Sequence, residues 1–121
     1  PKINKVSYIG WSQGGVGPIL SHFKRVTDLI DNGRNVFDSS IAIYPYCGFT
    51  FAKDSALNNP LLMLTGQDDD LTPERACINI YEKFNRDDGN INLISLEGAR
   101  HGYDNRTTLT CSKPSFKRSI A

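Results

Sequence analysis

The strongest constraint on the fold is a short glycine-rich turn between an apolar strand and a helical stretch. Gly10-Trp11-Ser12-Gln13-Gly14 follows a predicted strand at residues 5–9 and precedes residues 15–30, where apolar side chains recur at helical spacing. G-x-S-x-G in this setting is typical of a sharp turn that pushes the serine side chain outward. We therefore predict that Ser12 is a nucleophile. The backbone N–H of Gln13, at the positive end of the helix, is the expected donor to an oxyanion.

The same glycines also have the spacing of a phosphate-binding loop. Val16 stands where that loop requires a lysine, however, and the chain contains no G-x-G-x-x-G. These details argue against nucleotide binding.

Beyond the turn, short apolar runs alternate with longer amphipathic ones. Asn32-Gly33 ends the first helix, and Thr72 is predicted to cap a second helix that starts at Pro73 and continues through Phe84. Because most residues in the short runs are apolar, the runs predict strands that are buried on both faces, parallel to one another and joined by right-handed crossovers. The sequence therefore predicts an α/β fold, with strands at residues 5–9, 41–44, 61–65 and 91–96.

The composition of the chain limits which binding partners and which cellular compartment are expected. The 121 residues suit one domain, and 14 basic against 13 acidic residues attract neither nucleic acid nor an anionic membrane surface. The longest apolar runs fall far short of the ~18 residues of a membrane span, and residues 1–121 show no basic start followed by an apolar segment, the pattern of a secretion signal. Three cysteines without a C-x-x-C pair and two histidines argue against a zinc site and against any other metal. The odd cysteine count favours a reducing compartment, so we expect a cytoplasmic protein.

A catalytic serine needs a base and an orienting carboxylate. His101 follows the fourth strand and is the candidate base, whereas His22 lies inside the first helix, where a surface or hydrogen-bonded position is expected. Three acids, Asp68-Asp69-Asp70, follow the third strand. One βαβ unit takes about 30 residues, so the chain spacing brings Ser12, these acids and His101 to the same carboxyl edge of the sheet. The order serine, acid, histidine is the one expected of α/β-hydrolases.

Four segments together resemble the C-terminal half of a dienelactone hydrolase family protein, in the α/β-hydrolase superfamily. They are Gly10-Trp11-Ser12-Gln13-Gly14-Gly15, Tyr44-Pro45-Tyr46-Cys47-Gly48, Gly66-Gln67-Asp68-Asp69-Asp70-Leu71-Thr72-Pro73 and Gly98-Ala99-Arg100-His101-Gly102-Tyr103-Asp104. The resemblance implies a three-layer fold with about four strands here, in which residues 1–121 form a partial domain and residues after about 106 form a helix or a tail. It places the acid at Asp69, with Asp68 as the alternative. The namesake enzymes carry a cysteine at the turn, so Ser12 implies a serine esterase-like member.

Other residues allow more than one interpretation. Cys47 and Cys77 follow neighbouring strands, and the pattern favours an inert buried pair over a disulfide and, last, a catalytic thiol. Trp11, Tyr46, Phe49 and Tyr103 are candidates for an acyl pocket, although ordinary packing explains them equally well.

The function expected from the sequence is hydrolysis of a carboxylic ester or lactone by Ser12, His101 and Asp69, with no cofactor. The alternatives are a non-catalytic fragment or remnant of such a hydrolase and a small flavodoxin-like binding module. The strand before Ser12 is expected to be an open sheet edge, through which the chain would form a homo-oligomer.

Overall fold

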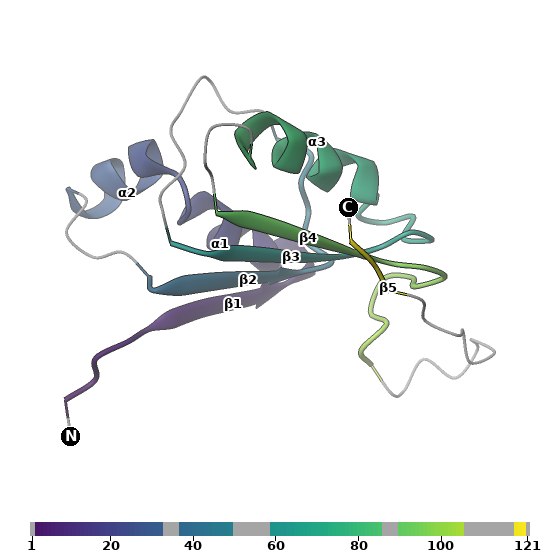
Figure 1. Cartoon of the computed structure of the whole chain (residues 1–121), viewed down its shortest axis with the longest axis horizontal. Coiled ribbons are helices and arrows are strands. Elements are labelled where there is room, and N and C mark those ends of the chain that lie inside the picture. The colour runs from purple at the N-terminus through teal and green to yellow at the C-terminus, as the bar shows by residue number, and fades with distance from the viewer. Residues whose placement is uncertain (1, 33–36, 50–58, 86–89, 106–117, 121) are drawn as a thin grey trace.

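The sheet follows the predicted order. The computed structural model describes residues 2–32, 37–49, 59–85, 90–105 and 118–120. Its four parallel strands lie side by side in chain order (Figure 1), and they are β1 (Ser7–Trp11), β2 (Ser39–Ile43), β3 (Leu61–Gly66) and β4 (Ile91–Leu96). The predicted α/β fold with a parallel sheet is confirmed, and β1 is the edge strand.

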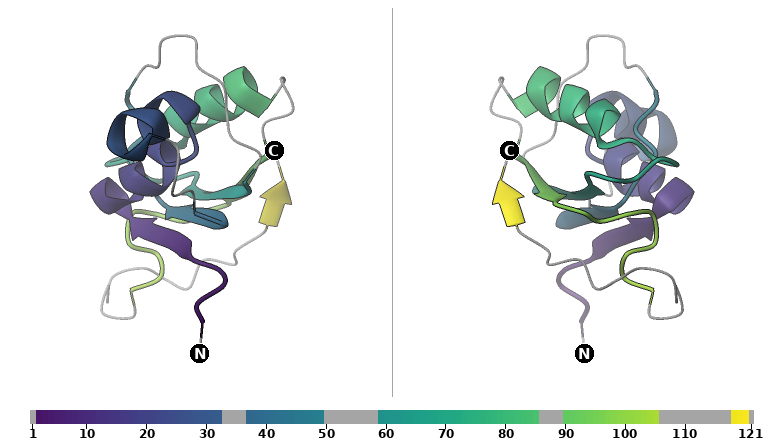
Figure 2. Two further views of the ribbon diagram at one scale, coloured as in Figure 1. Left: turned by 90° about the vertical axis from the view of Figure 1, so that its left-hand side faces the viewer. Right: turned by 90° about the vertical axis from the view of Figure 1, so that its right-hand side faces the viewer.

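All three α-helices lie on one face of this sheet (Figures 1 and 2). The strand order explains the arrangement, because right-handed crossovers that always step in the same direction place every connection on the same side. The described residues therefore form two layers, a sheet and a helical layer, of the three that were expected.

The helix predicted over residues 15–30 is interrupted. The turn η1 (Ser12–Gly15) leads into α1 (Val16–Leu20), and a separate α2 (Lys24–Asp31) ends at Asn32 in the left-handed conformation. Between them Phe23 is extended, with φ −104° and ψ 128°. This break turns the Phe23 ring into the core, where it is fully buried with its centroid 4.6 Å from that of Phe84.

His22, beside the break, departs from the surface or hydrogen-bonded position expected of it. Its side chain is fully buried, and neither ring nitrogen has a hydrogen-bond partner within the described part of the chain. Burial disfavours the charged form and lowers the pKa of His22 to about 4.

The second predicted helix is α3 (Glu74–Phe84), which begins one residue later than expected. Pro73, with ψ 129°, is the residue before the helix, and no side chain caps this end. The predicted cap Thr72 uses its hydroxyl elsewhere, as described below.

The two faces of the sheet differ in burial. Facing the helices, Ala42, Met63 and Leu93 lie in register across three strands and are almost wholly buried. On the opposite face, the register aligns Ile9 with Ile41 and Trp11 with Ile43, and Ile9 and Trp11 remain 45% and 43% exposed. Among the described residues, no helix covers this second face, which we call the uncovered face. Its further apolar residues are Leu62, Leu64, Ile94 and Leu96, all partly exposed.

The end of the chain differs from the expected helix or tail. Residues 106–117 lie outside the described residues, and the strand β5 (Arg118–Ile120) pairs antiparallel with β4. The sheet therefore has a fifth strand at the side opposite β1. None of the described helices has the length and apolar character needed to cross a membrane.

Candidate active site

Close backbone packing shapes the turn that carries Ser12. A Cβ on Gly10 would come within 2.1 Å of the Gly14 carbonyl oxygen, and one on Gly15 within 2.7 Å of Pro45. A Cβ on Gly14 would meet nothing, so only Gly10 and Gly15 are required for space. Ser12 itself has a φ of 52°, which is unfavourable for a residue with a side chain. The turn thus holds Ser12 in a strained conformation at the carboxyl end of β1.

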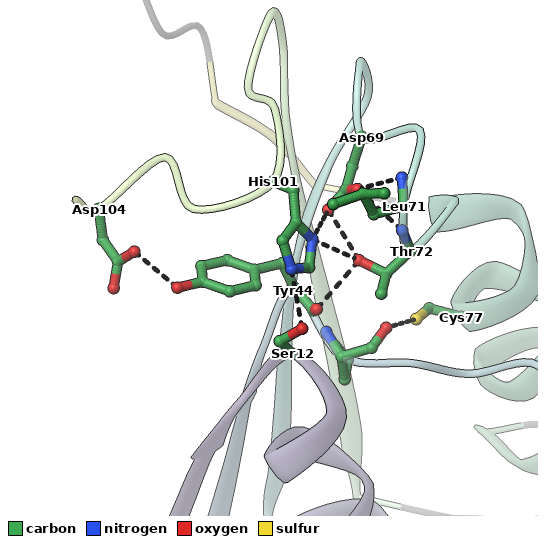
Figure 3. A network of polar contacts seen from close by, with 9 residues as sticks. Ser12, Tyr44, Asp69, Leu71, Thr72, Cys77, His101 and Asp104 are labelled. Atoms are coloured by element: carbon green, nitrogen blue, oxygen red, sulfur yellow. Dashed lines mark hydrogen bonds and ion pairs between the residues drawn. The ribbon is translucent and has the colours of Figure 1, made fainter. Parts of the chain in front are cut away.

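The three residues predicted for catalysis come together at this edge of the sheet (Figure 3). Ser12 Oγ lies 2.8 Å from His101 Nε2, and His101 Nδ1 lies 2.9 Å from Asp69 Oδ2. An ionised carboxylate only accepts hydrogen bonds, so the proton of neutral His101 belongs on Nδ1. The bare Nε2 can then accept the hydroxyl proton of Ser12.

Asp69 is completely buried, and the loop that carries it satisfies its carboxylate. Its Oδ1 accepts hydrogen bonds from the backbone N–H groups of Leu71 (3.0 Å) and Thr72 (2.8 Å), and its Oδ2 lies 2.7 Å from the Thr72 hydroxyl. Burial alone would raise the pKa of Asp69, but the hydrogen bonds from Thr72 and His101 outweigh it and hold the pKa below its usual value. By contrast, the neighbouring Asp68 and Asp70 are exposed. The structure therefore pairs His101 with Asp69 and not with Asp68.

Thr72 is a site residue that the sequence interpretation missed. Besides Asp69, its hydroxyl oxygen lies 3.1 Å from His101 Nδ1 and 3.1 Å from the carbonyl oxygen of Tyr44. The hydroxyl has a single proton, which it can donate to Asp69 or to the Tyr44 carbonyl, while its oxygen accepts from His101. Thr before Pro at a helix start is also the pattern of an N-cap, so the sequence signal was ambiguous.

A shallow pocket of about 270 Å³ opens beside the serine. It is lined by Ser12, Gln13, Tyr46, Leu71, Thr72 and His101. Of the predicted acyl-pocket residues, only Tyr46 is among them. Trp11 and Tyr103 lie outside this lining, and Phe49 lines a separate hollow of about 250 Å³ against α3, away from Ser12. Leu71, 68% exposed, is the apolar lining residue that the sequence interpretation did not include.

Cys47 and Cys77 form a disulfide with their Cα atoms 5.1 Å apart. It joins the segment after β2 to α3, so the inert pair that the sequence favoured is wrong, and neither sulfur is a free thiol. The cytoplasmic localisation expected from the cysteine count stays a prediction. Within the described ranges, no three His, Cys, Asp or Glu side chains gather closely enough to hold a metal ion.

Comparison with solved structures identifies the fold. Est1E from Butyrivibrio proteoclasticus superposes with a TM-score of 0.59 at 16% identity, over 85% of this chain and 55% of Est1E. Esterase PE8 gives a TM-score of 0.53 at 20% identity, over 81% of this chain and 45% of PE8. MGS-M1, an α/β hydrolase from a Medee basin deep-sea metagenome library, gives 0.54 at 17% identity, over 79% of this chain and 39% of MGS-M1.

No model of a protein family matches the chain, and no curated protein matches it in sequence. The chain spans about half the length of the solved structures it resembles. At these identities the likeness shows the fold alone, a parallel sheet with helices arranged as in these esterases and in an α/β hydrolase.

Proposed function

We propose that the chain contributes the catalytic centre of a serine hydrolase that cleaves carboxylic esters or lactones. The observation that carries the proposal is the continuous path of hydrogen bonds from Ser12 Oγ through the His101 ring to Asp69. Such a path activates a serine hydroxyl, because the base is within reach of the proton and the acid orients the base.

In the first step, Ser12 Oγ attacks the carbonyl carbon of the ester while His101 Nε2 takes the serine proton. Asp69 holds the ring through Nδ1 and stabilises the imidazolium that results. The negative charge that develops on the carbonyl oxygen is stabilised by the Gln13 backbone N–H at the start of η1. His101 then returns the proton to the leaving alkoxide, and the alcohol departs to leave an acyl ester on Ser12.

In the second step, water attacks this acyl ester as His101 Nε2 removes a proton from the water. Collapse of the second tetrahedral intermediate breaks the bond to Ser12 Oγ, which takes the proton back from His101. The carboxylic acid is released and the serine is restored. For a lactone, the alcohol and acid belong to the same product molecule.

The pocket favours an apolar acyl or alkoxy group, since Tyr46 and Leu71 present apolar surface beside Ser12. The motifs quoted above favour a dienelactone hydrolase-type enzyme with serine as its nucleophile. The rival is a non-catalytic fragment or remnant of such a hydrolase. If the second oxyanion donor belongs to a part of the protein outside this chain, turnover by the 121 residues alone will be weak.

The test combines covalent labelling with turnover. We expect a fluorophosphonate to attach to Ser12, located by mass spectrometry of the peptides, and p-nitrophenyl acetate to be hydrolysed. Ser12→Ala should lower turnover by about three orders of magnitude or more and abolish the adduct, because members of such a triad act as a unit.

Ser7→Ala is the matched control, since Ser7 lies at the opposite end of β1 and its hydroxyl contacts Ser39. Labelling at no serine would favour the remnant. A Ser12→Ala variant that kept most of its turnover would refute Ser12 as the nucleophile.

A further inference from the structure

The carboxylate of Asp104 joins the loop that carries His101 to the ends of β1 and β2. It lies three residues after His101, on the loop of residues 97–105. Its Oδ2 accepts a hydrogen bond of 2.8 Å from the indole Nε1 of Trp11, and its Oδ1 accepts one of 2.8 Å from the hydroxyl of Tyr44. Figure 3 shows the second of these bonds at the far side of His101 from Asp69.

Both donors are adjacent to reacting groups. Trp11 is the residue directly before Ser12 at the end of β1. Tyr44, just after β2, packs its ring edge-on against the His101 ring, with centroids 4.7 Å apart and planes 62° apart. Tyr44 is also strained, with a φ of 35°, and its carbonyl oxygen lies 3.1 Å from the Thr72 hydroxyl. A displacement of Asp104 would therefore affect both neighbours of the Ser12–His101 contact.

The histidine loop needs anchors on both sides of His101. Gly98 and Gly102 have φ values of 71° and 73°, a conformation that glycine adopts freely and that gives the loop no stiffness of its own. Before His101, the loop is fixed by a hydrogen bond from the Asp68 N–H to the Ala99 carbonyl. After His101, the carboxylate of Asp104 provides two bonds to the strand ends.

The chemistry of the contact fits a fixed carboxylate. Burial, followed by the hydrogen bond to Asp104, raises the pKa of Tyr44 to about 12, so the phenol remains a donor at any physiological pH. An indole N–H is a donor only. Both partners thus require an acceptor, and a carboxylate can serve both at once.

We propose that Asp104 is a positioning residue that sets the distance between Ser12 and His101 by binding Trp11 and Tyr44 together. The proposal rests on the proposed function, because the distance matters only if Ser12 donates its proton to His101. Misplacing a catalytic group by about 1 Å can cost on the order of 100-fold in rate. We call the two hydrogen bonds of Asp104 to Trp11 and Tyr44 the clamp. Loss of this clamp should therefore lower the rate of the chemical step more than it weakens substrate binding.

The main test compares Asp104→Asn with Glu97→Gln in the full chain. Glu97 is an exposed acid at the start of the same loop, so its variant controls for the loss of one negative charge. An asparagine can accept from one donor with its oxygen, but its NH₂ group repels the other donor. We expect kcat for p-nitrophenyl acetate to fall about 10- to 100-fold in Asp104→Asn, with KM within about threefold. Glu97→Gln should change neither constant.

Two single-donor variants keep the test informative if Asp104→Asn does not fold. Trp11→Phe and Tyr44→Phe each delete one hydrogen bond and retain most of the ring. Each should lower kcat by a smaller factor than Asp104→Asn, with KM unchanged. If both keep the parent kcat, the clamp does not position the site and the proposal is overturned.

A measurement that does not depend on enzymatic turnover distinguishes failure of the positioning role from failure of the proposed function. Proton NMR can follow exchange of the His101 Nδ1 proton with solvent, which its contact with Asp69 slows. We expect Asp104→Asn to accelerate this exchange at least tenfold while Glu97→Gln does not. If the parent chain proves inactive yet this difference appears, the proposed function fails and the positioning role stands. If the parent chain is active but neither exchange nor kcat responds to Asp104→Asn, the positioning role fails alone.

Discussion

At the carboxyl edge of the sheet, the Asp69 side chain has no exposed surface and accepts four hydrogen bonds, whereas on the uncovered face Ile9 and Trp11 leave 45% and 43% of their surface exposed. The hydrogen bonds of the buried carboxylate at this edge thus come from loops that directly follow the strands. The described helices all lie on the other side of the sheet (Figures 1 and 2), so cover for the apolar face would have to come from other elements. The contrast teaches that the loops directly after the strands are enough to place the acid and the base. Burial of both faces of the sheet, by contrast, depends on which other elements pack against it.

The largest effect on any measured rate is expected for Asp69, at the carboxyl edge of the sheet. Asp69→Asn should lower the rate of Ser12 acylation by about four orders of magnitude, because the amide favours the wrong His101 tautomer. Asp68→Asn and Asp70→Asn should stay within a few-fold of the parent, since both side chains are exposed. Stopped-flow measurement of the p-nitrophenol burst ranks the three variants. If Asp68→Asn is the most damaging, the pairing of His101 with Asp69 is wrong.

The two faces themselves can be compared by adjacent truncations on β3. Met63→Ala, on the helix-covered face, should lower the free energy of unfolding by about 2–5 kcal/mol, because it leaves a cavity in a packed core. Leu64→Ala, on the uncovered face, should cost about 1 kcal/mol, since its side chain is already partly in water. Urea unfolding of both variants gives the two values. Equal losses would mean that the second face is as well packed as the first.

The burial of His22 on the helix-covered side can be tested through the pH dependence of stability. Its pKa is about 4 when folded and about 6.5 when unfolded, so the unfolded state gains a proton first as the pH falls. Stability should therefore be lost between pH 6.5 and 4, by about 3 kcal/mol. The corresponding loss from Asp69, whose pKa is also lowered, falls below the ordinary carboxylate value of 3.8 and so in a separate window.

The matched variant for this measurement is His22→Leu, which has no group to protonate. Urea unfolding between pH 7 and 4 should show a flat stability in this window for the variant and a decline for the parent. A parent chain that is equally stable at both ends of the window would contradict a buried, neutral His22.

The smallest effect on stability is expected on the uncovered face. Ile9→Lys should change the free energy of unfolding by no more than about 0.5 kcal/mol, because Ile9 is 45% exposed. It should nevertheless reduce self-association, since it places a charge on the apolar side of the edge strand β1. Sedimentation over a range of concentrations would show this change. Leu29→Lys, which alters an exposed residue on α2, should leave association as it is.

The sequence indicated the four parallel strands, but not β5, and the members of the candidate triad, because apolar runs and chain spacing are short-range patterns. Apolar runs bounded by turn residues defined β3 and β4 closely, and the spacing of Ser12 and His101 in the chain places them at one edge of any parallel sheet. Side-chain partnerships across the fold were harder. The break at Phe23 lets its ring contact that of Phe84, 61 residues away, and the helical periodicity of one segment carries no information on so distant a partner.

Thr72 and Asp104 were missed for a related reason. A threonine before a helix can cap the helix or support a neighbouring carboxylate, and only the position of His101 decides between them. The partners of Asp104 lie 93 and 60 residues away. The disulfide likewise depends on a Cα separation of 5.1 Å that chain spacing alone does not fix.

The bond between Cys47 and Cys77 also closes a covalent ring that contains Asp69 and Thr72 but excludes Ser12 and His101. A protease that cuts once inside this ring opens it without releasing a fragment. The cleaved chain therefore keeps its full mass, plus one water, until a reductant is added. The residues that hold the acid remain covalently attached to the sheet by two routes, whereas a cut between β4 and His101 leaves no covalent link between the base and the serine.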